Sequence, residues 1–394
     1  MAEINFKTEN GELTVYLYGH VDTSNAAEIE REINDKRAEY PCKTLIFDCE
    51  KLEYISSAGL RIFMRIKKAI SDTKAINVSS EVYDIFDITG FTEILEVKKA
   101  YRKISVEGCE VIGQGANGKV YRIDPETIVK VYLNPDALPD IQRERELARA
   151  AFVLGIPTAI PYDVVRIEGG GYGSVFELLN ATSFAKLLIR GEKTVDEVAK
   201  MSIDLLKLIH STVVKPGSMP DMKTVALKWA SDLKPYLPKE QAEKLYSLIA
   251  AVPDDDHMMH GDYHIKNVML QNGESLLIDM DTICHGHPVF EFASMYNAYV
   301  GYAALDHDVV LKFLGIPYEQ TTELWRKSLE LYLDTTDEKR IKEVEEKAMI
   351  VGYTRIMRRT IRRHGFDSEE GRATIEYCKK TLGELLSRTD TLTF

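Results

Sequence analysis

The 394-residue chain lacks several features that would each have pointed to a class of protein. It has no excess of basic residues: the formal net charge is −12, which disfavours a nucleic-acid binder because counterion release needs a concentrated positive surface. It has no apolar run near the roughly 18 residues that span a bilayer, and its first residues, MAEINFKTENGEL, lack a signal region. We therefore expect a cytoplasmic protein with no membrane and no nucleic-acid partner.

Closely spaced cysteines are also missing. The five cysteines are scattered and odd in number, at positions 42, 49, 109, 284 and 378. This distribution favours reduced thiols over a disulfide framework. At this chain length we expect two or three domains.

The first hundred residues alternate strand and helix patterns. Strands are predicted near 13–18, 44–47 and 76–79, and helices over 26–37, with Thr23 or Ser24 as N-cap, and from about 56 to 71. A charged stretch at 96–107 breaks the periodicity, so we place a domain boundary near residue 101. The pattern predicts a small α/β domain, a mixed sheet with helices, over 1–100.

The remainder of the chain divides into a strand-rich segment and a helical one. Residues 101–182 are rich in strand patterns around one helix near 141–154, and residues 183–394 are almost entirely helical apart from a His/Asp-rich loop at 257–292. A strand-rich segment followed by a helical one predicts an α+β arrangement of two lobes, with the chemistry at their junction.

A glycine-rich loop opens the second segment. Gly113, Gly115 and Gly118 form a G-x-G-x-x-G-x-V pattern, whose backbone amides can approach phosphate oxygens because no Cβ intervenes. Alone the pattern is weak, since glycine turns between strands are often structural. A strand pattern follows the third glycine, which disfavours a dinucleotide-binding fold and favours a kinase-like loop.

Lys130 lies within the apolar strand pattern Thr-Ile-Val-Lys-Val. Burying a lysine is costly without an anionic partner, and Glu144 on the following helix could supply one and hold the ammonium towards nucleotide phosphates. Glu146 is a competing partner. The alternative is an edge strand with the lysine head in water.

The most specific pattern is His260-Gly-Asp262-Tyr-His264-Ile-Lys-Asn267, followed by Leu277-Ile-Asp279-Met-Asp281. Phosphoryl transfer needs a carboxylate to orient the acceptor hydroxyl and oxygen ligands to hold magnesium. The Asp-x4-Asn spacing places a base candidate and a metal ligand on one loop. The histidines at 257, 260, 264, 285 and 287 make a zinc site the competing interpretation, although no thiolate pair accompanies them.

Residues from about 105 to 390 resemble the aminoglycoside phosphotransferase and choline kinase superfamily, relatives of the protein kinases. The resemblance implies ATP and Mg²⁺ as cofactors and a hydroxyl acceptor. It implies that Asp262 is the catalytic aspartate, with Lys130 and His264 as further catalytic groups, and that Asn267 and Asp279 bind the metal. The nucleotide-binding positions that it implies are Gly113, Gly115, Gly118, Lys130, Glu144, and the hinge residues Glu177 and Leu179. Glu291 departs from the family, which more often has aspartate there.

Residues 1 to about 100 resemble the STAS domain of anti-anti-sigma factors, through Gly19-His-Val-Asp-Thr23, Phe47-Asp48 and Ser56-Ser-Ala-Gly-Leu60. The resemblance puts Ser57 at the phosphoacceptor position and implies a protein partner. Ser56 stands where the motif usually has aspartate. A serine at a helix start can also be a plain N-cap.

Two charged segments have open interpretations. Residues 355–364 carry five arginines, either a solvated face or a basic wall for an anionic substrate or a docked partner. Asp254-Asp-Asp256 is either an ordinary acidic turn or an attraction for a cationic substrate.

The sequence thus predicts a STAS domain followed by a bilobal kinase-like domain that acts on a small-molecule hydroxyl. The alternative is a signalling protein that phosphorylates a protein, Ser57 included, or whose nucleotide state gates STAS binding.

Overall fold

The computed structural model describes residues 4–115 and 118–394, so Ala116 and Asn117 of the glycine loop, and the first three residues, lie outside the described residues. The chain divides into two compact units: residues up to Glu107 with Val164–Gly171, and Gly108–Asp163 with Tyr172–Phe394. All five cysteines are unpaired. Within the described ranges, no helix is long and apolar enough to cross a bilayer.

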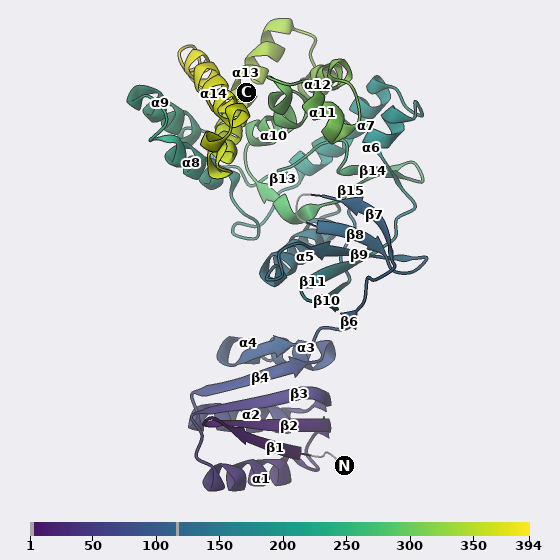
Figure 1. Ribbon diagram of the computed structural model, residues 1–394, viewed down its shortest axis with the longest axis vertical. Helices are drawn as coiled ribbons and strands as arrows, with labels where there is room; N and C mark the ends of the chain where they lie inside the picture. Colours follow the sequence, from purple (N-terminus) through teal and green to yellow (C-terminus); the bar gives the residue numbers. More distant parts are fainter. Residues whose placement is uncertain (1–3, 116–117) are drawn as a thin grey trace. The chain divides into compact units, whose positions relative to one another are not determined.

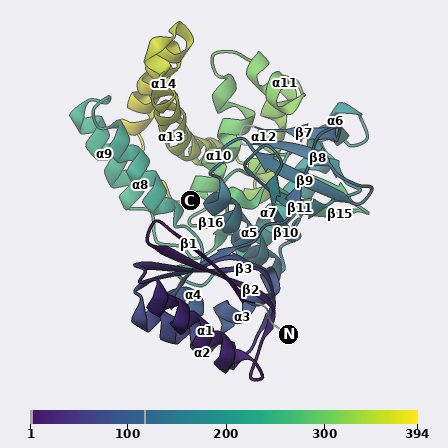
Figure 2. The same ribbon diagram turned by 60° about the horizontal axis from the view of Figure 1, so that its bottom comes forward.

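The first unit is built on a five-stranded sheet of order β1-β2-β3-β4-β5, with β1 antiparallel and the others parallel (Figure 1). Figure 2 shows its helices on one side of this sheet. The elements are β1 Ile4–Glu9, β2 Glu12–Val21, α1 Ala26–Glu39, β3 Thr44–Ile55, α2 Ser57–Ala69, β4 Asp72–Val78, α3 Ser80–Ile88, α4 Phe91–Ile94 and β5 Glu96–Lys99. A short strand, β6 Lys103–Ile104, then pairs in parallel with β10 Asp163–Ile167.

The sequence accounts for the one-sided layer. Leu13, Val15 and Leu17 on β2 are buried at every second position, so one face of the sheet is covered. The predicted N-caps of α1 are wrong: α1 follows Asn25, and the Ser24 hydroxyl donates instead to the Asp22 carboxylate.

The second unit begins with four strands in the order β11-β9-β8-β7, all antiparallel, and one helix. Their bounds are β7 Glu110–Gln114, β8 Gly118–Arg122, β9 Thr127–Tyr132, α5 Leu138–Val153 and β11 Tyr172–Glu177. Because β9 lies between β8 and β11, Lys130 is not on an edge strand.

The rest of the second unit is mostly helical, around a large apolar core. Its helices are α6 Phe184–Ile189, α7 Val195–Ser211, α8 Met222–Leu233, α9 Lys239–Ala250, α10 Val289–Tyr299, α11 Asp308–Leu314, α12 Tyr318–Leu333, α13 Glu338–Arg362 and α14 Glu369–Leu386, with 3₁₀ turns η1 Met280–Thr282, η2 Gly301–Ala303 and η3 Gly365–Asp367. Its strands are β12 Thr182–Ser183, β13 Met258–Met259, β14 Val268–Gln271, β15 Glu274–Leu277 and β16 Cys284–His285. The predicted His/Asp-rich loop contains the short strands β13 to β16. In it β13 pairs with β16 and β14 pairs with β15, and these pairs hold the loop in place.

Candidate active site

Lys130 forms the centre of an ion-pair cluster. Its Nζ lies 3.0 Å from Oε1 of Glu144 and 2.6 Å from Oδ1 of Asp279, a residue 149 positions away. Burial would lower the pKa of Lys130, but the two carboxylates outweigh it and raise that pKa, so the ammonium stays charged. The cluster joins β9, α5 and the segment after β15 at one point.

Glu144, and not Glu146, is the partner of Lys130, because the two glutamates lie on different faces of α5. Glu144 is buried, whereas Glu146 is exposed. The hydroxyl of Tyr132 also donates to Glu144 and lies 3.2 Å from the Ser174 hydroxyl. The Glu144 carboxylate is therefore fixed from two sides and can hold Lys130 in place.

The three glycines of the glycine-rich loop differ in the space that surrounds them. A Cβ at Gly118 would lie 2.3 Å from the Val131 carbonyl oxygen, so strand packing alone requires glycine there. A Cβ at Gly115 would meet nothing within 4 Å, so open space borders the loop at this position. Gly113 meets only the Val120 side chain, at 3.6 Å.

The predicted hinge lies at the end of β11. The Leu178 N–H donates to the Glu126 carbonyl at 2.7 Å, which directs this amide towards the neighbouring strand. Glu177 is exposed and Leu179 is half-buried. Because successive backbone groups of a strand alternate in direction, those of Glu177, the last residue of β11, point away from Glu126.

The backbone of the loop that carries Asp262 is held by Glu291 of α10. The fully buried carboxylate of Glu291 accepts hydrogen bonds from the His260 N–H at 2.6 Å and the Gly261 N–H at 3.0 Å. Gly261 has a φ of +79°, and a Cβ there would lie 2.4 Å from the Thr282 carbonyl oxygen, so only glycine fits. Glu291, whose side chain is longer than the aspartate expected at this position, thus holds the backbone of this loop in place.

Replacing Glu291 by glutamine should destabilise the fold. The substitution turns one acceptor into a donor that faces a backbone N–H, so a buried polar group loses its partner, at a cost of about 1–3 kcal/mol. Burial would raise the pKa of Glu291, but His210 outweighs it and lowers that pKa in the fold, so this stabilisation is present at neutral pH and is lost as pH falls through the folded pKa. Chemical denaturation at neutral and acid pH measures both effects. The exposed control, Glu319→Gln, should change neither, and equal stability of the two variants would contradict this role.

Asp262 lies between two basic side chains. Its Oδ2 is 3.6 Å from Nε2 of His264, and its Oδ1 is 3.8 Å from Nη2 of Arg355. Burial alone would raise the pKa of Asp262, but His264 and Arg355 outweigh it and lower that pKa, so the carboxylate is ionised at neutral pH. The side chain keeps 42% of its surface exposed, so an incoming hydroxyl can reach it.

The oxygen donors for a divalent cation gather beside this loop. The Asn267 amide nitrogen donates to the Asp262 carbonyl at 3.0 Å, which leaves the amide oxygen as its acceptor atom. Asp279 adopts the left-handed region at φ +64°, an uncommon backbone for a non-glycine residue. Burial and the nearby Asp279 carboxylate raise the pKa of Asp281 to about 7. Such an oxygen-rich set with excess negative charge fits Mg²⁺.

Two of the histidines behind the competing zinc interpretation have other partners. No group of three or more His, Cys, Asp or Glu side chains in residues 4–115 and 118–394 is arranged to hold a metal ion. His257 instead contacts Asp255, through Nδ1 at 2.5 Å. Nδ1 of His285 lies 2.8 Å from the backbone carbonyl oxygen of Asp255.

In the first unit, Ser57 is the first residue of α2 and is exposed. The helix is capped by Ser56, whose hydroxyl accepts the Ala58 N–H at 3.2 Å. The plain N-cap role therefore belongs to Ser56. Arg61 contacts Ser57 through Nη2, 3.4 Å from the Ser57 hydroxyl. A Cβ at Gly59 would lie 2.6 Å from the Ile55 side chain, so this position of the motif requires glycine for packing.

Three contacts of the loop that carries Asp262 were not predicted from the sequence. Arg355 and Ser294 approach Asp262 from α13 and α10, and Glu291 anchors the loop backbone. A signal existed for Glu291: a carboxylate within the apolar helix Val289–Tyr299 needs buried donors. Arg355 was visible only as one member of a basic run.

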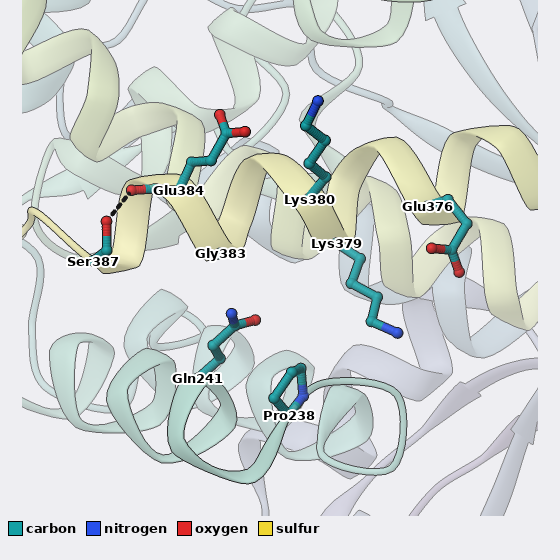
Figure 3. A pocket seen from close by; sticks show the side chains of 8 residues that line it. All are labelled: Pro238, Gln241, Glu376, Lys379, Lys380, Gly383, Glu384 and Ser387. Atoms are coloured by element: carbon teal, nitrogen blue, oxygen red, sulfur yellow. Dashed lines mark hydrogen bonds between the residues drawn. The ribbon is translucent and has the colours of Figure 1, made fainter.

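A cavity of about 540 Å³ lies away from these residues, between α9 and α14. Figure 3 shows its lining, including Lys379, Lys380, Glu376 and Glu384 from α14 and Gln241 from α9. Two acidic and two basic side chains line it, and no residue of the predicted site takes part.

Two family models match the chain. The model described as "Phosphotransferase enzyme family" (APH) matches residues 108–319, and the STAS domain model matches residues 3–104. Both predicted resemblances are thereby confirmed, and with them the fold class of an α/β STAS domain followed by a kinase-like α+β domain.

Individual relatives were also found. The Bordetella bronchiseptica protein "Putative anti-sigma factor antagonist BtrV" is 32% identical over 92 residues, which are 22% of this chain and 78% of that protein. Among solved structures, the ADP-bound aminoglycoside phosphotransferase APH(2'')-Ib is 16% identical with a TM-score of 0.46, covering 78% of this chain and 96% of that one. A choline/ethanolamine kinase family protein from Mesorhizobium loti is 14% identical with a TM-score of 0.46, covering 71% and 88%.

Proposed function

The chain belongs to the phosphotransferase enzyme family, and on this premise we propose that it transfers the γ-phosphoryl group of ATP to a hydroxyl of a small molecule, with Mg²⁺ as cofactor. The observation that carries the proposal is the convergence of Lys130, Glu144 and Asp279 beside the loop of Asp262 and Asn267. Segments far apart in sequence bring together the parts that phosphoryl transfer requires.

Each side chain has a defined task in this reaction. Lys130, held by Glu144, binds phosphate oxygens, and the backbone of Glu177 and Leu179 receives the adenine. Asn267 and Asp279 would hold Mg²⁺, which neutralises phosphate charge when bound. Asp262 orients the acceptor hydroxyl and takes its proton as the oxygen bonds to the γ-phosphorus and the bond to the β-phosphate breaks, releasing ADP. His264 keeps the Asp262 carboxylate ionised before transfer. The segments 101–182 and 183–394 act as the two lobes around this site.

The proposal is tested by thermal unfolding of the full chain with nucleotides. Mg-ATP should raise the midpoint in a concentration-dependent way, because a ligand that binds only the folded state stabilises it by mass action. The same concentration of adenosine with Mg²⁺ is the control for phosphate binding and should raise the midpoint less. A midpoint unchanged by ATP or GTP would contradict the proposal.

For residues 1–100 we propose a docking role towards a protein partner, supported by the STAS match and by the similarity to an anti-sigma factor antagonist. Ser57 is the candidate regulatory phosphoacceptor, since its exposed hydroxyl is not used as a helix cap. A phosphate there would add about two negative charges to the docking surface.

We expect Ser57 not to be the kinase's own substrate. A serine in the first turn of a packed helix cannot enter a deep cleft without local unfolding, although fusion of the domains raises its effective concentration. Intact-mass spectrometry after incubation with Mg-ATP should show no stoichiometric phosphate on the wild type. A gain of one phosphate that maps to Ser57, and is lost in both Ser57→Ala and Asp262→Asn, would instead establish a self-modifying switch.

A further inference from the structure

A row of arginines runs along one face of α13, starting at the catalytic loop. Arg355, Arg359 and Arg362 are spaced by four and three residues, so their side chains project from the same side of the helix. At 1.5 Å of rise per residue the row covers about 10 Å. This length is within the span of one small molecule.

The first arginine of the row is fixed against the catalytic loop. Nη1 of Arg355 donates to the Gly261 carbonyl at 3.2 Å and to the Ser294 hydroxyl at 3.0 Å. Its guanidinium also lies over the Trp229 ring, 5.6 Å from the centroid. The side chain retains 29% of its surface exposed, so an acceptor whose hydroxyl reaches Asp262 meets this guanidinium.

The next two arginines carry positive charge without an acidic partner. Arg359 donates to the neutral Tyr302 hydroxyl at 2.8 Å, and its guanidinium lies 5.3 Å from that ring centroid. Within the ranges that the structure describes, no carboxylate lies within ion-pair distance of Arg359 or Arg362. Arg358 lies three residues after Arg355 on the same side of α13, but its charge is balanced, because it pairs with Asp232 of α8 at 2.5 Å.

The acidic turn near the catalytic loop does not balance this charge. Asp254 pairs with Lys223 at 2.8 Å, and Asp255 pairs with His257 at 2.5 Å. These carboxylates are therefore engaged locally, and a cationic substrate would have to compete with a lysine and a histidine for them.

We propose that the arginine row selects the acceptor, and that the acceptor is a small alcohol carrying a carboxylate or phosphate group within about 10 Å of the reacting hydroxyl. The inference rests on the proposed function and specifies its acceptor. A guanidinium presents a planar fork of donors that matches the oxygens of carboxylate and phosphate. A polycationic acceptor would instead place ammonium groups beside unpaired arginines, and like charges repel.

The test is steady-state ADP release by the full chain, saturated with Mg-ATP, with probes of different charge. Glycerate and glycerol 3-phosphate are the anionic alcohols, glycerol is the neutral one, and choline and kanamycin are the cationic ones. We expect at least one anionic alcohol to stimulate ADP release above the rate with water, with a kcat/KM at least about tenfold above that of any neutral or cationic probe.

Charge variants then locate the selecting groups. Arg359→Gln and Arg362→Gln should each raise the KM for the anionic acceptor by about tenfold, with the KM for ATP and the melting temperature unchanged. Lys342→Gln is the matched control: it removes one positive charge from the exposed side of α13 near the start of the helix, and it should change none of these quantities.

Three results would overturn the inference: preference for choline or kanamycin, no stimulation by either anionic alcohol, or arginine variants that behave like Lys342→Gln. The last result would identify the row as a solvated face. In each case, continued Mg-ATP hydrolysis would leave the proposed function intact. Absence of both nucleotide binding and hydrolysis in the wild type would defeat the proposed function itself, and the inference with it.

Discussion

Asp262→Asn should lower the rate of phosphoryl transfer by about 10²- to 10⁴-fold, the usual contribution of a positioned acid–base group, while nucleotide affinity stays unchanged. Asparagine keeps the shape of the side chain and can still meet Arg355 and Ser294, but it cannot accept the proton of the acceptor hydroxyl. The loss should appear in kcat, because the residue acts on the acceptor and not on the phosphates.

The measurement is ADP release with saturating acceptor, beside calorimetric titration of Mg-ATP into both proteins. Asp204→Asn is the matched control, since Asp204 is exposed on α7 and, among the residues that the structure describes, pairs only with Lys200. An Asp262→Asn protein that transfers phosphate at a near-wild-type rate would show that the active site lies elsewhere.

Asp279→Asn should weaken the binding of Mg-ATP by at least about tenfold and lower turnover as well. A neutral amide oxygen is a poorer ligand for Mg²⁺ than a carboxylate. Asparagine tolerates the left-handed backbone that Asp279 adopts, so the substitution changes charge with little strain. The comparison therefore isolates the electrostatic role.

The magnesium dependence separates this role from a structural one. Without Mg²⁺ the variant should bind ATP no more weakly than the wild type, because one negative charge near the phosphates has been removed. Calorimetric titrations with and without Mg²⁺ measure the four affinities. Equal magnesium dependence in the two proteins would contradict Asp279 as a metal ligand.

Some features of the site could be predicted because they are local in sequence. The Asp262-x4-Asn267 spacing fixes both side chains on one loop, whatever the rest of the chain does. Helical periodicity could also have identified Glu144 rather than Glu146 as the partner of Lys130, because Glu144 shares a helical face with the buried Ile141 and Leu147.

Other features depend on packing that no local pattern encodes. Arg355 lies 93 residues beyond Asp262, and which arginine of the basic run faces the loop follows from how α13 packs on α10 and α8. The N-cap of α1 was predicted wrongly because the Ser24 hydroxyl, a suitable cap by residue type, is engaged by Asp22 two positions earlier.

The most direct test of the central claim is calorimetric titration of ATP into the folded full-length chain with and without Mg²⁺. The account predicts binding at one site per chain that is tighter with Mg²⁺ and is weakened in Lys130→Ala, because Lys130 is the phosphate-binding cation held by Glu144. Absence of heat for ATP and for GTP with a protein shown to be folded would contradict the account.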